Sequence, residues 1–179
     1  MKVKNEQALR SGREFEELVF GHVAKQDQIS ISELGAPTYL HFKNSLQQQI
    51  YHNWSIAEAA VEQGRSDYYN PSNPRTGQSH KVWESVKNFL PTEESGKKEP
   101  LHFYMSIGRN SLDYWHGVDA FFVWRGTFVT IDLSLGRKKY PSADFILTPA
   151  DMNDHKRLLV FGRKAADLLI KRHENNETL

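Results

Sequence analysis

Hydrophobic and polar positions follow two different periods along the chain, and the period changes near residue 100. In the first part, apolar residues recur at helical spacing, which predicts a helix over residues 5–25. The same spacing predicts further helices over residues 41–52, 55–64 and about 80–90. Ser55 is the expected N-cap of the helix that begins there.

From residue 100 onward, short runs rich in aromatic and β-branched residues predict strands. These runs cover residues 101–107, 115–124, 127–135 and 142–149. An amphipathic stretch over about 153–173 then predicts a terminal helix, with Asn153 or Asp154 as its cap. Helices first, strands later and a terminal helix together indicate a layered α/β or α+β domain.

Two of the predicted strands lie in the stretch HGVDAFFVWRGTFVTIDLSLGRKK, residues 116–139, and each holds one aspartate among apolar residues. If Arg125 and Gly126 form a two-residue turn, the strands pair so that Asp119 lies directly opposite Asp132. Side chains that face each other in this way have Cβ atoms about 5 Å apart. A shift of the register by one residue would instead place the two aspartates on opposite faces of the sheet.

The predicted register gives the hairpin one apolar face, which we expect to belong to the core. That face consists of Val118, Ala120, Phe122, Trp124, Val129, Ile131 and Leu133. The opposite face carries both aspartates. Because like charges opposite each other are destabilising, a partly buried pair needs either a proton on one carboxyl or a cation between them.

Two carboxylates, together with a backbone carbonyl and water, are ligands that suit Mg²⁺ or Mn²⁺. The alternative is a local role for each aspartate. Asp119 would then accept hydrogen bonds from a loop, and Asp132 would pair with a nearby Lys or Arg.

Composition narrows the classes of protein that fit. At 179 residues, the chain is expected to form one domain, residues 1–179. The absence of cysteine excludes disulfides, zinc–thiolate sites and thiol nucleophiles. The formal net charge is only +1, but the segment 137–172 holds nine Lys or Arg against four Asp or Glu. Since no stretch approaches a membrane span or a signal peptide, we expect a cytoplasmic protein with no membrane partner.

The acidic positions resemble the motif of the PD-(D/E)XK nuclease superfamily, the restriction-endonuclease-like proteins. In this chain GVD supplies Asp119, and IDLS supplies Asp132, Leu133 and Ser134. The stretch SGREFEELVF carries Glu16 in a context similar to the G-x-x-F-E of the family's first helix. The resemblance implies a central mixed four-stranded sheet flanked by helices, with residues 26–99 as a helical insertion between the first helix and the sheet.

Helical geometry separates Glu16 from the neighbouring Glu17. Glu16 lies about 100° around the helix from Phe15, at the rim of the buried stripe, whereas Glu17 lies about 200° away and should face water. The resemblance implies that Asp119, Asp132 and the Leu133 carbonyl hold Mg²⁺ or Mn²⁺. Glu16 would contact the metal directly or through water.

One position departs from the family pattern. The family's lysine would fall at position 134, where this chain has Ser134. Lys138 or Lys139, just past the strand end, could reach back to supply the catalytic cation, and Arg137 is a third candidate. If none of them reaches the site, the resemblance implies a slow or inactive relative.

The function implied by the resemblance is metal-dependent hydrolysis of nucleic-acid phosphodiester bonds, with DNA as the first expectation. The expected nucleic-acid-binding cations are Arg137, Lys138, Lys139, Lys156, Arg163 and Lys164. A nuclease-like protein that binds DNA without cutting it is one alternative. A protein-interaction or regulatory module is another, and a homodimer remains open in each case.

Overall fold

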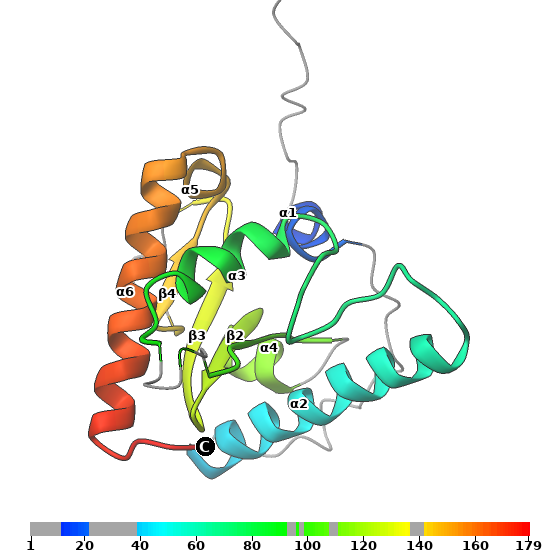
Figure 1. Ribbon diagram of the computed structural model, residues 1–179, viewed down its shortest axis with the longest axis horizontal. Helices are drawn as coiled ribbons and strands as arrows, with labels where there is room; N and C mark the ends of the chain where they lie inside the picture. Colours follow the sequence, from blue (N-terminus) through cyan, green and yellow to red (C-terminus); the bar gives the residue numbers. More distant parts are fainter. Residues whose placement is uncertain (1–11, 22–38, 93–95, 97–98, 108–110, 137–141) are drawn as a thin grey trace, which may run out of the picture.

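The described part of the chain is a mixed sheet enclosed by helices (Figure 1). The computed structural model describes residues 12–21, 39–92, 96, 99–107, 111–136 and 142–179. Its helices are α1 (Gly12–Phe20), α2 (Tyr39–Glu62), α3 (Ser79–Lys87), α4 (Ser111–His116), α5 (Pro149–Asn153) and α6 (His155–Glu174). Its strands are β1 (His102–Met105), β2 (Ala120–Trp124), β3 (Thr127–Leu133) and β4 (Phe145–Leu147).

The strands lie in the order β1-β2-β3-β4. The pairs β1–β2 and β2–β3 are antiparallel, whereas β3 and β4 run parallel. The described residues therefore confirm an α/β fold with a mixed four-stranded sheet flanked by helices.

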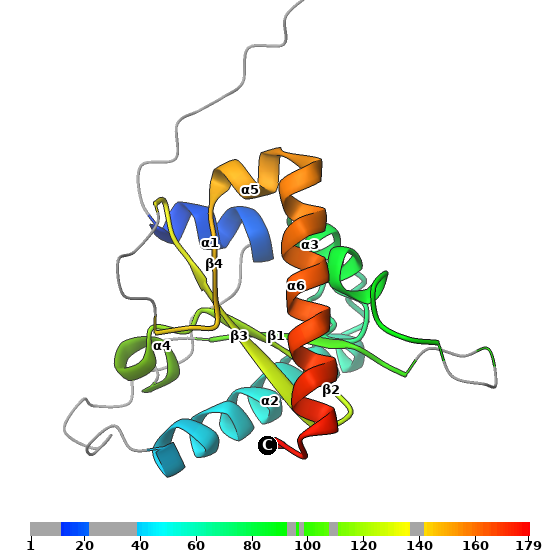
Figure 2. The same ribbon diagram turned by 90° about the vertical axis from the view of Figure 1, so that its left-hand side faces the viewer.

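Helices cover both faces of the sheet, as Figure 2 shows from the side. On one face, α1, α3 and α6 bury a large apolar core against β2 and β3. On the other face, α2 and α4 enclose a smaller cluster around Leu46, Leu112 and Phe121. The sheet thus lies between two helical layers, and both of its faces are buried.

The helix α2 runs without a break where the sequence pattern indicates two helices. The predicted start at Ser55 is wrong, because the residue lies inside α2. Buried positions at Gln49, Asn53, Ala57 and Ala60 follow one stripe through this point. One continuous helix buries that stripe against the sheet, and this packing outweighs the capping preference of a serine.

The strand predicted over 115–124 is also too long at its start. His116 lies in α4, and β2 begins only at Ala120. Near the end of the chain, Asp154 is the N-cap of α6, since its side chain accepts bonds from the N–H groups of Lys156 and Arg157. The short helix α5 before it has no counterpart among the sequence predictions.

The outer edge of β1 is closed by side chains rather than by another strand. Asn53 of α2 donates to the Met105 carbonyl at 2.8 Å and accepts from the Met105 N–H at 3.2 Å. Gln49 accepts from the Ile107 N–H at 2.8 Å. The buried Tyr69 donates to the Phe103 carbonyl at 2.6 Å. These bonds satisfy backbone groups that an edge strand would otherwise expose.

None of the helices in the described ranges has the length and apolar character needed to cross a membrane.

Candidate functional site

The β2–β3 hairpin has the predicted turn, and the predicted register is confirmed from Trp124 to Ala120. Arg125 and Gly126 both have positive φ, 50° and 77°, as a type I′ turn requires. The ladder runs from Trp124 opposite Thr127 to Ala120 opposite Ile131. Gly126 adopts this conformation without a steric cost, and the right-handed twist of the strands favours such a turn.

The apolar face of the hairpin is confirmed for all but one of its predicted members. Ala120, Phe122, Trp124, Val129, Ile131 and Leu133 are buried in the core beneath α1, α3 and α6. Val118 is the exception, because it packs with Leu112 and Phe121 on the opposite side of the sheet. Strict alternation of side chains therefore fails between residue 118 and the start of β2.

The alternation of side chains is interrupted at Asp119, which lies just before β2. The Asp119 N–H donates to the Ile131 carbonyl at 2.9 Å, although Ile131 is the residue paired with Ala120. Two residues of one strand thus lie opposite one residue of the other, which is the arrangement of a β-bulge. The regular ladder ends at the Ala120–Ile131 pair, so the predicted pairing of Asp119 directly opposite Asp132 is wrong, because the bulge places Asp119 with Ala120 opposite Ile131.

Where the ladder ends, the Asp119 side chain accepts the hydrogen bond that a backbone carbonyl would otherwise accept. Its Oδ2 accepts a 2.6 Å hydrogen bond from the Leu133 N–H, a group that continued strand pairing would have bonded to a backbone carbonyl. Its backbone carbonyl accepts from Ser106 at 2.7 Å. The carboxyl is therefore fixed against β3. Within the described residues, its other oxygen, Oδ1, forms no hydrogen bond.

Burial is the main reason that the pKa of Asp119 rises from 3.8 to about 8. The hydrogen bond from Leu133 favours the charged form and lowers the pKa. The negative charges of Glu16, Asp113 and Asp132 raise it further. The described charged groups that shift this pKa are thus all acidic, and only 9% of the Asp119 surface is exposed.

Glu16 lies where the helical wheel places it. Phe15 and Val19 of α1 are fully buried, Glu16 is half-buried and Glu17 is exposed. The carboxyl of Glu16 is close enough to Asp119 for its charge to raise the pKa of that residue. The half-buried Glu16 and the exposed Glu17 confirm the predicted position of Glu16 at the rim of the buried stripe.

Asp132 lies within β3, paired with Ile146 of β4, and only 4% of its surface is exposed. Its charge contributes to the raised pKa of Asp119. The fold thus gathers the predicted acids Glu16, Asp119 and Asp132 at the end of β3.

A fourth acid, Asp113, was missed by the sequence analysis. It lies in α4, and its charge also raises the pKa of Asp119. The sequence offered only one weak signal, an acid six residues before Asp119 in a stretch too short for helical periodicity. The pattern predicts a strand from residue 115 and gives no role to Asp113.

The carboxylates of the described residues do not form a closed metal site. No group of three or more His, Cys, Asp or Glu side chains in the described ranges is arranged to enclose a metal ion. Mg²⁺, however, commonly binds proteins through one or two carboxylates and completes its shell with water and phosphate oxygens. Asp119 and Asp132 are the two carboxylates that such a site would use, and the neighbouring acids, after burial, contribute to the raised pKa of Asp119.

The predicted cations divide into two sets. Arg137, Lys138 and Lys139 lie outside the described residues. Lys156, Arg163 and Lys164 are exposed on α6, whose opposite side is buried through Leu158, Phe161 and Ala165. The predicted amphipathic pattern of α6 is therefore confirmed.

The departure at Ser134 leaves no cation on the strand itself. The Ser134 N–H donates to the Leu147 carbonyl at 3.1 Å and so continues the contact with β4.

Two histidines meet where α2 contacts α4. Nε2 of His116 lies 3.1 Å from Nδ1 of His41. Burial and the neighbouring His41 both lower the pKa of His116, which favours the neutral ring.

Comparisons of the chain with protein-family models, curated proteins and solved structures give no match. The resemblance to the PD-(D/E)XK nucleases thus stays a prediction, and the properties of the site follow from its own geometry and charge.

Proposed function

We propose that the protein is a metal-dependent nuclease of the restriction-endonuclease-like kind, which hydrolyses phosphodiester bonds in DNA. The observation that carries the proposal is the environment of Asp119. Its buried carboxyl is held against β3 by a bond from the Leu133 N–H and is surrounded by the charges of Glu16, Asp113 and Asp132. Such a concentration of acids is costly to the fold unless protons or a cation neutralise it.

In this proposal Asp119 and Asp132 hold the cation, and the Leu133 carbonyl and Glu16 complete or orient the site. A divalent cation bound there lowers the pKa of a coordinated water and neutralises charge that develops on the phosphoryl oxygens. The hydrogen bond from Leu133 fixes Oδ2 of Asp119, so that Oδ1 is oriented before substrate binds. Burial strengthens each electrostatic interaction in the site, because water screens it less.

The cations of α6 fit the binding of a polyanion. Lys156, Arg163 and Lys164 are exposed on the outer side of the helix, and Lys171 continues the series. Contacts of this kind give affinity without base specificity and weaken as salt increases. Lys138 or Lys139 would supply the cation that Ser134 does not.

The test is a cleavage assay with Mg²⁺ or Mn²⁺ on duplex DNA, single-stranded DNA and RNA. Asp132→Asn keeps the size of the side chain and removes its charge. We expect this change to lower the cleavage rate by at least about a hundredfold, the scale of losing a group that stabilises transition-state charge. Asp167→Asn is the matched control, because Asp167 is an exposed acid of α6 outside the site, and it should cleave normally.

Equal cleavage by the wild type and Asp132→Asn would remove Asp132 from the mechanism. Absence of metal-dependent cleavage on every substrate would instead favour the second candidate, a nuclease-like protein that binds nucleic acid without cutting it. The specific observation in favour of this candidate is Ser134, at the position where the resemblance expects lysine. Salt-dependent DNA binding without turnover would identify it.

A further inference from the structure

A second site lies on the sheet face that α2 covers, where a cavity of about 440 Å³ opens beside β3. This volume falls within the range of small-ligand sites. The lining residues are Tyr39, Phe42, Phe128, Thr130, Ser142, Asp144, Arg172, Asn176, Glu177 and Thr178. They come from the start of α2, from β3, from the segment before β4, and from the end of α6 with the residues that follow it.

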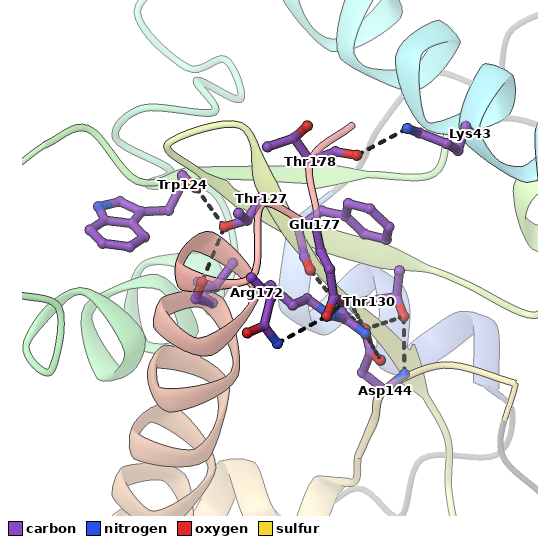
Figure 3. Close-up of polar contacts among 11 residues, drawn as sticks. Lys43, Trp124, Thr127, Thr130, Asp144, Arg172, Glu177 and Thr178 are labelled. Carbon is purple, nitrogen blue, oxygen red and sulfur yellow. Dashed lines mark hydrogen bonds and ion pairs between the residues drawn. The ribbon is translucent and has the colours of Figure 1, made fainter.

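The charged groups of this cavity are already paired with one another (Figure 3). Arg172 donates to both carboxylate oxygens of Asp144, at 2.8 and 2.7 Å, and to the Phe128 carbonyl at 2.6 Å. Asp144 Oδ2 also accepts from the N–H and the hydroxyl of Thr130, at 2.8 and 2.9 Å. Arg172 is therefore committed to a bidentate pair and is poorly placed to bind a phosphate.

The remaining charge in the cavity argues against an anionic ligand as well. Glu177 also lines the cavity, lies 3.7 Å from Arg172 and is more than half exposed, so that it adds a second negative charge to the lining. Since Asp144 already balances Arg172, the lining as a whole is acidic. A phosphate would be repelled there, whereas an uncharged group or one with N–H donors would be accepted.

Aromatic rings form a continuous wall of the cavity. The ring centroids of Tyr39 and Phe42 are 6.5 Å apart, and those of Phe42 and Phe128 are 5.9 Å apart. Tyr39 is 70% exposed at the mouth. One exposed tyrosine ring, followed by the rings of Phe42 and Phe128 and lying beside the hydroxyl and amide groups of Ser142, Thr178 and Asn176, suits a flat heteroaromatic group that stacks and forms hydrogen bonds at its edge.

The cavity lies next to the acidic site along the same strand. Thr130 lines it, and Asp132 is two residues further on β3, at about 7 Å for two strand residues. A Cβ placed on Gly117, two residues before Asp119, would lie only 3.4 Å from the Ser142 hydroxyl oxygen. The lining of the cavity therefore touches the segment that carries Asp119.

We propose that this cavity binds an unstacked nucleobase, so that the substrate is single-stranded or locally unpaired nucleic acid with one base inserted beside the scissile phosphate. The binding of a base follows from the cavity itself. Its role beside the cleaved bond rests on the proposed nuclease function.

The test measures binding of 2-aminopurine riboside to the full chain by quenching of its fluorescence, without metal and without phosphate. Tyr39→Ala should weaken binding at least about fivefold, the lower end of what a base–aromatic stack contributes. Tyr51→Ala is the matched control, because Tyr51 is equally exposed at 70% on the same helix but does not line the cavity. It should bind like the wild type.

Each other outcome overturns the nucleobase site: no binding at millimolar riboside, equal effects of the two tyrosine changes, or displacement of the riboside by inorganic phosphate. Displacement by guanidinium or an arginine peptide would assign the cavity to a cationic side chain of a protein partner and would also overturn it. Because the assay contains no metal, it fails or succeeds independently of cleavage. Cleavage without riboside binding refutes only this site, and riboside binding without cleavage refutes only the nuclease.

Discussion

The raised pKa of Asp119 predicts how the free energy of unfolding depends on pH. In the unfolded chain this carboxyl titrates near 3.8, and in the folded protein near 8. The folded state therefore binds the proton more tightly, and stability falls as the pH rises from the lower value to the higher one. At 1.36 kcal/mol per pKa unit, the loss is on the order of 5 kcal/mol, comparable to the whole stability of many domains.

Asp119→Asn removes this titration while preserving the shape of the side chain. The amide oxygen can still accept the bond from the Leu133 N–H that Oδ2 now accepts at 2.6 Å. We therefore expect the variant to exceed the wild type in stability by about 1.5 kcal/mol near pH 5 and by about 5 kcal/mol near pH 9. Urea denaturation of both proteins across this range, in a buffer with a chelator, measures the difference.

Two additions make the measurement decisive. Asp167→Asn, an exposed acid outside the site, should shift stability equally at every pH. Adding Mg²⁺ at high pH should restore stability to the wild type but not to Asp119→Asn, because a bound ion stabilises only the state that binds it. Parallel pH profiles for the wild type and Asp119→Asn would refute the buried, acid-surrounded state of this carboxyl.

Two further predictions concern packing around the sheet. Gly162→Ala places a Cβ about 2.0 Å from the Ser85 carbonyl oxygen where α3 meets α6, and the helices must separate. We expect a loss of about 3 kcal/mol and a fall in Tm of roughly 5–12 °C in a thermal melt, whereas Gly136→Ala, with open space around it, should be neutral. Asn53→Ala leaves the N–H and carbonyl of Met105 without their partner and should cost about 2–4 kcal/mol in urea denaturation. A cost below about 1 kcal/mol would mean that water replaces the amide.

The hairpin could be predicted from the sequence because local chemistry determines it. A two-residue turn fixes the register of both strands. In each strand every second residue is apolar, and these residues form the face that packs in the core. Once Arg125 and Gly126 are the turn, the pairing from Trp124 to Ala120 follows without any knowledge of the rest of the fold. The face of α1 that carries Glu16 could be predicted for the same reason, since a single helical period defines it.

The bulge at Asp119 could not be predicted, because a distant contact decides it. Val118 packs with Leu112 of α4 against the α2 side, and this draws the chain out of the strand before Asp119. The helix α4 is six residues long, too short to give a periodic signal. In the sequence, the alternation of apolar residues extends back through Val118. In the fold, the contact of Val118 with Leu112 turns this side chain to the other face of the sheet, so that the alternation begins only at β2.

The covering of the β1 edge could not be predicted for a related reason. Gln49 and Asn53 are polar residues of a helix, which a hydrophobicity pattern assigns to the solvent side. In the fold both are almost fully buried, because their amides replace the backbone of a missing neighbour strand. A residue that substitutes for backbone hydrogen bonds looks the same in the sequence as one that faces water.

The bulge also fixes the carboxyl on which the proposed metal site depends. Had the ladder continued, the Leu133 N–H would bond to a backbone carbonyl, and the Asp119 carboxyl would have no fixed acceptor role. Instead that N–H holds Oδ2 at 2.6 Å, whether the group is charged or neutral. In the proposed metal site a cation would compete with the proton for Oδ1, and its binding would release the proton that burial and the surrounding acids hold below about pH 8. Burial is thus the main cost of Asp119 in the free protein, and the negative charge around it adds to that cost and would favour the proposed metal.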